Sequence, residues 1–180
     1  TANGDYDGDG DVDQIFNYGA RSFSIWDEFG NLVYDSGNEF ARLIAEINPE
    51  NFNSNNDDND SRKSRSDDKG VEPEAVEIIQ QGDTTLALIG LERQGGIMIY
   101  NISDPTAPYF VNYYNNRNFD VDATSPEAGD LGIEDIVYIS AADSPTGEPL
   151  VVTPNEVSGT VTIWGAEFDE DGFMLRIIHN

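Results

Sequence analysis

Residues 91–100 read LERQGGIMIY and residues 155–164 read NEVSGTVTIW, so an acidic residue, a glycine turn and an apolar run recur after 64 positions. The stretches before them also repeat, with EAVEII at 74–79 and EDIVYI at 134–139, which are 60 positions apart. The four extra residues fall in the longer turn at 143–149. A repeat of about 60 residues that holds four short strands has the size of one β-propeller blade with generous loops.

A third, more distant copy reads YGARSFSIW at 18–26 and is followed by a turn at 28–31. The chain therefore divides into blade-like units at about 13–70, 71–130 and 131–180. We predict an all-β fold in which residues 1–180 form a partial β-propeller of about three blades, each a four-stranded antiparallel sheet. A free-standing antiparallel sandwich is the alternative. Because a closed propeller needs at least about four blades, the prediction requires further blades or a partner chain.

Short apolar runs predict the strands of these units. Each run is rich in β-branched and aromatic residues and is bounded by Gly, Asp, Asn or Pro. The runs lie at 22–26, 31–34, 75–79, 86–90, 97–100, 109–111, 135–139, 150–152, 160–164 and 173–178. A weak helical pattern covers 38–47, with Phe40, Leu43, Ile44 and Ile47 on one face. Residues 51–68 form a polar insertion, which is either a functional or metal-ordered loop or a disordered segment.

The most specific chemical pattern lies near the start, where residues 5–13 read DYDGDGDVD. Carboxylates fall at positions 1, 3, 5 and 9 of a calcium loop, on Asp5, Asp7, Asp9 and Asp13, with Gly10 at the sharp turn and the carbonyl of Asp11 at position 7. An EF-hand would place a bidentate Glu at position 12, where this chain has Phe16, and residues 14–18 are typical of a strand. We predict a Ca²⁺ site on a strand hairpin; the alternative is a solvated acidic turn.

The composition excludes several classes of function. Thirty-five acidic and nine basic residues give a formal charge of −26, which disfavours nucleic acid and anionic membranes as partners. There is no cysteine, and the single histidine, His179, lies at the chain end, so a histidine-rich zinc centre or a Ser-His-Asp triad is excluded. No stretch approaches the roughly 20 apolar residues of a membrane span. We predict an extracellular or periplasmic protein.

The repeat itself suggests a site. Glu74 and Glu134 begin equivalent strands, and Glu92 and Glu156 follow the next strands. In a propeller such positions face the mouth of the central channel, where repeated carboxylates could form an acidic ring that holds a cation. Alternatively, Glu74 and Glu134 accept backbone N–H groups from the neighbouring blade. Arg93 has no basic counterpart in the next unit and is a third candidate for a catalytic role.

A basic cluster lies next to these acids. Four of the nine basic residues fall within eight positions, at Arg62, Lys63, Arg65 and Lys69. In so acidic a protein this cluster would favour a phosphate or carboxylate ligand. We predict a substrate-binding group made of Arg65, Lys69, Glu92, Asn155 and Glu156. Calcium held by Glu74, Glu134 or Asp67 and Asp68 could then assist hydrolysis of a phosphomonoester.

Several motifs carry a resemblance to a known family: DYDGDGDVD at 5–13, YGARSFSIWD at 18–27, RSDDKG at 65–70 with EPE at 72–74, IGLERQGGIM at 89–98, AADSPTG at 141–147 and NEVSGTV at 155–161. Over nearly the whole chain they resemble the C-terminal part of the choice-of-anchor I domain. The resemblance implies a secreted or surface-attached bacterial β-propeller, of a group commonly labelled alkaline phosphatase-like or esterase-like.

Two functions therefore remain open. The first is a calcium-dependent, alkaline phosphatase-like phosphoesterase of the extracellular space. The second is a non-catalytic adhesion or binding module whose calcium is structural. A catalytic role requires Glu74, Glu134 and Arg93 to converge on one cavity.

Overall fold

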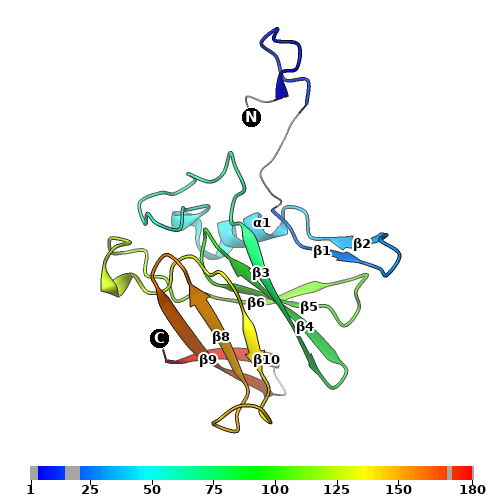
Figure 1. The fold of residues 1–180 in the computed structure, drawn as a ribbon, viewed down its shortest axis with the longest axis vertical. Coiled ribbons are helices and arrows are strands. Elements are labelled where there is room, and N and C mark those ends of the chain that lie inside the picture. The colour runs from blue at the N-terminus through cyan, green and yellow to red at the C-terminus, as the bar shows by residue number, and fades with distance from the viewer. Residues whose placement is uncertain (1–3, 15–20, 170–171, 180) are drawn as a thin grey trace.

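The structure is a computed structural model that describes residues 4–14, 21–169 and 172–179. Its described part contains three antiparallel sheets, which have two, four and four strands (Figure 1). The strands are β1 (Ser24–Trp26) and β2 (Leu32–Asp35), then β3 (Pro73–Gln81), β4 (Thr84–Leu91), β5 (Ile97–Asn101) and β6 (Tyr109–Tyr114), then β7 (Val137–Ile139), β8 (Leu150–Asn155), β9 (Thr160–Asp169) and β10 (Gly172–His179). The helices are α1 (Glu39–Ile47) and two 3-10 turns, η2 (Pro49–Asn51) and η3 (Pro126–Ala128). The predicted all-β fold is confirmed.

Both four-stranded sheets are simple meanders. Strands β3 to β6 are neighbours in sequence order, and so are β7 to β10. All ten predicted apolar runs lie in strands, with shifts of a few residues at the ends. The further strand predicted at 14–18 falls mostly outside the described residues.

The two meanders pack face to face. Leu86 and Leu88 of β4 and Ile99 of β5 form one apolar core with Val151 of β8 and Trp164 of β9. Each of these side chains is at most 6% exposed. Because side chains alternate along a strand, the residues between them point to the opposite face of the β3–β6 sheet. The central strands β4 and β5 are therefore buried on both sides, whereas Val76 and Ile78 of β3 are exposed on the opposite face.

The opposite face of the β3–β6 sheet is covered by α1 and the β1–β2 hairpin (Figure 1). Phe40 and Ile44 of α1 are fully buried there, so the helix predicted at 38–47 is confirmed, one residue shorter. Aromatic rings make much of the contact: Tyr100 lies edge-on to Phe23 and Phe40, with centroids 4.9 and 5.6 Å away. Such pairs add about 0.5–1.5 kcal/mol beyond the burial of their area.

The first predicted blade differs from the other two. Residues 21–70 contain the β1–β2 pair, α1 and a long loop, where the prediction has four strands. The physical reason is the composition of 51–68, whose Asn, Asp, Ser, Arg and Lys side chains cannot cover a sheet. They bond to one another and to distant loops, as described below.

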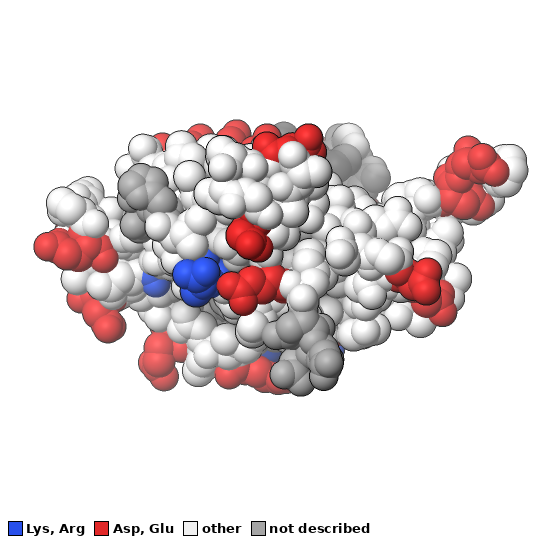
Figure 2. Space-filling view, turned by 90° about the horizontal axis from the view of Figure 1, so that it is seen from below, with Lys and Arg blue, Asp and Glu red and all other residues white. Residues whose placement is uncertain are grey.

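Charge is spread over the surface in an uneven way. Figure 2 shows a face of mostly uncharged side chains, with acidic side chains at its edges, further acidic ones near its middle beside a basic group, and few basic ones elsewhere. The few basic residues are therefore informative wherever they gather.

Candidate functional site

The two meanders present the same turn at the same end. In the first, the amides of Glu92 and Arg93 donate to the carbonyls of Glu72 and Val71, at 2.8 and 3.2 Å. In the second, the amides of Glu156 and Val157 donate to Gly132 and Leu131, at 2.7 and 3.2 Å. The acceptors are 60 positions apart and the donors 64, which are the offsets of the sequence repeat. Glu92 and Glu156 therefore hold corresponding positions.

The correspondence makes Glu72 unusual. Its counterpart is Gly132, and both have a positive φ, 52° for Glu72 and 71° for Gly132. A left-handed backbone costs a non-glycine residue about 1–2 kcal/mol. At Gly132 a side chain would also meet Val157, whose Cγ2 would lie 2.8 Å from the added Cβ. In the first unit this Gly–Val contact is replaced by the pair Glu72 and Arg93.

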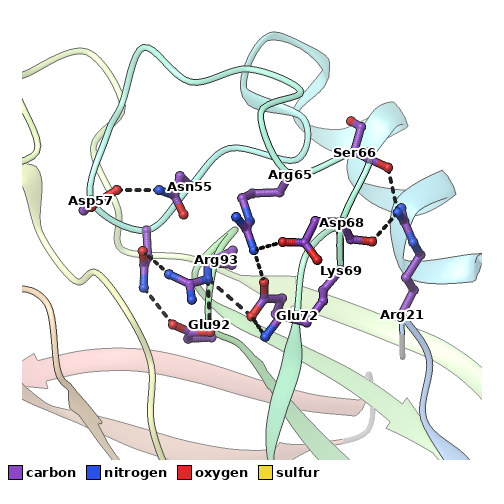
Figure 3. Close-up of polar contacts among 11 residues, drawn as sticks. Arg21, Asn55, Asp57, Arg65, Ser66, Asp68, Lys69, Glu72, Glu92 and Arg93 are labelled. Atoms are coloured by element: carbon purple, nitrogen blue, oxygen red, sulfur yellow. Dashed lines mark hydrogen bonds and ion pairs between the residues drawn. The ribbon is translucent and has the colours of Figure 1, made fainter. Parts of the chain in front are cut away.

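Glu72 lies at the centre of a group of basic side chains (Figure 3). Its carboxylate, which is 4% exposed, pairs with Arg65 at 2.8 Å, Lys69 at 2.6 Å and Arg93 at 3.3 Å. Burial by itself would raise the pKa of Glu72, but hydrogen bonds from Lys69 and Arg65 outweigh it and lower the pKa to about 2. The carboxylate is ionised at neutral pH and forms an ion pair with each of the three cations, and Asp68 gives Arg65 a second anionic partner at 2.6 Å.

Glu92 has the opposite electrostatic environment. Its Oε1 accepts from Asn56 at 2.7 Å, and its Oε2 lies 3.3 Å from Nε of Arg93. Burial and the neighbouring carboxylate of Glu72 raise the pKa of Glu92 to about 8, against the attraction of Arg93. Two adjacent buried carboxyl groups cannot both ionise at low cost. Near neutral pH this pair therefore holds one proton, on Glu92.

Carboxylates of the neighbouring sheet extend the cluster. Oxygen atoms of Glu72, Glu74 and Glu92 lie within 4.8 Å of one another. In the second unit the charge of Glu156 raises the pKa of Glu134, followed by slight desolvation and, from the first unit, the charge of Glu74. Glu74, Glu134 and Glu156 are exposed, and the ion pairs of the described residues do not include them. The outward part of the cluster is thus acidic.

Arg117 holds the polar loop against this cluster. Its guanidinium donates to the carbonyls of Arg93, at 2.8 Å, and Asn55, at 2.7 Å, and to Oδ1 of Asn59 at 2.8 Å. The side chain also covers the ring of Phe119, 4.4 Å from its centroid. Residues 51–68 are therefore joined to the rest of the fold by several hydrogen bonds. Arg21 closes the far end of the loop, donating to the carbonyls of Ser66 and Asp68, each at 2.6 Å.

The predicted site residues are thus partly brought together. Arg65, Lys69, Arg93, Glu92 and Glu74 surround Glu72, and Glu134 and Glu156 lie at the adjoining end of the next sheet. Asn155 is 4% exposed and bonds within its own sheet, to the carbonyl of Thr153 and the hydroxyl of Thr160. Described backbone N–H groups donate to neither Glu74 nor Glu134. One hydrogen bond between the two sheets is instead made by Glu77, which accepts from the amide of Tyr138 at 3.0 Å.

Sequence reasoning missed Glu72 as the centre. It also missed Asn56, which donates to Glu92 and accepts from Arg93, and Arg117, which holds the loop. One signal could have identified Glu72: it stands where the next repeat has a glycine. A charged residue at a glycine position of a repeat indicates a specific contact that outweighs backbone strain.

The predicted calcium loop has a partly suitable geometry. Oxygen atoms of Asp5, Asp7 and Asp13 lie within 4.8 Å of one another, whereas Asp9 is not part of this group. Gly8 and Gly10 have φ of 78° and 96°, which lets the loop turn back on itself. Three convergent carboxylates are the oxygen donors that a hard divalent cation prefers, so the residues present fit Ca²⁺.

Comparison with protein families matches residues 1–105 to the choice-of-anchor I domain. Gigasin-3a of Magallana gigas is 33% identical to the chain over 168 residues, which are 87% of this chain and 59% of that protein. The chain thus spans less than two thirds of the length of this relative. No solved structure matches the chain.

Proposed function

Because the chain belongs to the choice-of-anchor I domain family, we propose that it is part of a secreted or surface-attached, calcium-binding β-propeller that acts as a binding module. The family favours a surface or secreted location. In the described residues, no helix has the length and apolarity needed to cross a membrane. The observation that carries the proposal is the pairing of Arg65, Lys69 and Arg93 with the buried carboxylate of Glu72.

This pairing argues against a phosphate site. A phosphate ligand needs unpaired cations that face the solvent. Here the basic side chains face Glu72, and the exposed carboxylates of Glu74, Glu134 and Glu156 lie beyond them. The exposed part of the cluster would repel an anion and attract a cation. The cluster is better suited to fasten the 51–68 loop and the two repeated turns together.

The propeller architecture is supported by the two consecutive meanders, which share one core and one pattern of turn hydrogen bonds. The units at 71–130 and 131–180 would be successive blades, whereas the described part of the unit at 13–70 supplies only the β1–β2 pair, α1 and the long loop. On the β7–β10 sheet, Val137, Val161 and Met174 are 46%, 54% and 44% exposed. These are apolar positions that a following blade, in a longer chain or a partner, would cover.

Binding of calcium to the loop at 5–13 is testable through Tyr6, which lies in the loop and is 67% exposed. We expect Tb³⁺ to give tyrosine-sensitised luminescence that Ca²⁺ displaces, since both ions prefer the same carboxylate donors. Asp5→Asn and Asp13→Asn should each remove most of the signal, because either change deletes one of three converging charges. Asp104→Asn, in an exposed turn, is the matched control. Equal luminescence from all four proteins would refute the site.

A second candidate is metal-assisted phosphomonoester hydrolysis. One observation favours it: the neighbouring carboxyl groups of Glu72 and Glu92 have pKa values near 2 and near 8, a split typical of acid–base pairs. In this scheme a calcium ion held by Glu74 and Glu134 would polarise the phosphate, and Arg93 would neutralise the developing charge.

Hydrolysis of p-nitrophenyl phosphate separates the two candidates. The binding-module proposal predicts the same rate with calcium, with chelator and in buffer alone, because the basic side chains are already paired. The hydrolase predicts a chelator-sensitive rate that falls by about 10²-fold or more in Arg93→Ala. Arg176→Ala is the control, since the Arg176 side chain is 69% exposed and pairs with Glu167, outside the carboxylate cluster. If the rate is sensitive to chelator, and Arg93→Ala abolishes it while Arg176→Ala does not, the binding-module proposal is wrong and the protein is a hydrolase.

A further inference from the structure

A cavity lies at the end of β3 opposite the carboxylate cluster. It has a volume of about 570 Å³ and is lined by residues of both four-stranded sheets. Gln81 and Thr84 flank the β3–β4 turn, and Asn101 and Tyr109 are cross-strand partners beside the β5–β6 turn. The cavity is of the size that proteins use for small ligands, which is about 300–1,000 Å³.

Aromatic rings form one part of its wall. Tyr109, Phe168 and Phe173 line the cavity, and the last two rings pack against each other with centroids 4.7 Å apart. Tyr109 is 58% exposed, although it is a large side chain at the edge of an apolar core. An exposed ring at the mouth of a cavity offers a flat apolar surface on which a ligand can stack.

Neutral hydrogen-bonding groups form the rest of the wall. The amide of Gln81 and the hydroxyl of Thr84 make no hydrogen bond among the described residues, and Asn101 uses only its Oδ1, which accepts from Ser103 at 3.0 Å. An amide offers both donors and acceptors. Although the chain has a charge of −26, none of the described residues that line the cavity is charged.

We infer that this cavity binds a neutral, hydroxyl-rich ligand of the size of a short oligosaccharide. A sugar has an apolar C–H face that stacks on an aromatic ring and hydroxyl groups that pair with amides, which are the two kinds of group present. Among the lining residues that the structure describes, a phosphate or carboxylate ligand would find no cation, and a metal ion would find no carboxylate. The inference rests on the proposal of a binding module and states what the module binds.

The test uses the whole chain and a panel of neutral tetrasaccharides built from glucose, mannose, galactose, xylose and N-acetylglucosamine. Binding is measured by titration calorimetry and by saturation-transfer NMR. We expect at least one sugar to bind and Tyr109→Ala to weaken it by roughly tenfold or more, since an aromatic contact of about 1.4 kcal/mol is lost. Tyr109→Phe keeps the ring and should retain most of the affinity. Phe29→Ala, at an 81% exposed ring of the β1–β2 turn, is the matched control and should bind as the parent does.

Two results would overturn the inference. The first is that no sugar of the panel binds with a dissociation constant below 10 mM to a protein whose melting curve shows it folded. The second is equal affinity in the parent and Tyr109→Ala, which would place the sugar elsewhere. Terbium binding at the 5–13 loop is measured on the same samples. A protein that binds terbium but no sugar would refute the sugar inference and leave the calcium proposal standing.

Discussion

Replacing Arg117 with alanine is expected to lower the free energy of unfolding by about 3 kcal/mol or more. The guanidinium is only 7% exposed, and its donors satisfy the carbonyls of Arg93, Asn55 and Asp58 and the side chain of Asn59. Each buried acceptor that loses its donor costs about 1–3 kcal/mol. For a chain of this size the melting temperature should fall by roughly 2–4 °C per kcal/mol, that is by about 6–12 °C.

Arg117→Lys should recover little of this loss. Burial lowers the pKa of Arg117 to about 10, so the guanidinium is still charged at neutral pH. A lysine at this position would keep the positive charge. A lysine ammonium, however, cannot reach carbonyls on both sides of a planar fork. Arg42→Ala is the control, because Arg42 is 58% exposed and makes one ion pair, with Glu39. Its effect should stay within about 0.5 kcal/mol. Comparable melting temperatures for Arg117→Ala and Arg42→Ala would contradict the role given to Arg117.

The sheets could be predicted because their signals are local. Runs such as 86–90 and 97–100 are apolar, rich in branched residues and bounded by turn residues, and both are strands. The helix at α1 follows from the spacing of Phe40 and Ile44. The repeat placed Glu92 and Glu156 at corresponding turns before any contact was known. These features depend on periodicity within a few residues, which tertiary packing then reinforces.

The centre of the candidate site could not be predicted in the same way. Residues 65–74 contain so many charges that they look like a solvated loop, and charged side chains are rarely buried unless they are paired. Glu72 is buried because Arg117 and Arg21, from distant parts of the chain, hold the loop over it. The spacing of the aspartates in the calcium loop is also a local signal. It does not reveal that the carboxylate of Asp9 lies outside the group formed by Asp5, Asp7 and Asp13.

The second large effect concerns the proton shared by the carboxyl pair. Folded Glu92 has a pKa raised from its ordinary 4.5 to about 8, because it is buried beside Glu72. Between about pH 5 and pH 8 the folded chain therefore holds a proton that the unfolded chain has lost. Stability should then fall as the pH rises through this range, by up to about 1.4 kcal/mol per pH unit from this group. Glu72, whose pKa is lowered to about 2, acts in the opposite sense and stabilises the fold only above about pH 2–4.5.

Glu92→Gln isolates this effect, because glutamine has the shape and the donor of the protonated acid but does not titrate. Urea unfolding in the presence of chelator, at pH 5, 6, 7 and 8, should give a smaller loss of stability with pH for Glu92→Gln than for the parent. At pH 8 the variant should be the more stable protein, which is an uncommon outcome for a change at a 5% exposed residue. Glu167→Gln, at an exposed carboxylate, is the control and should follow the parent at each pH. A parent and a Glu92→Gln variant that lose stability in parallel would mean that Glu92 is ionised in the folded chain. The basic cluster would then neutralise both carboxylates, and the proton assigned to the pair would have to be withdrawn.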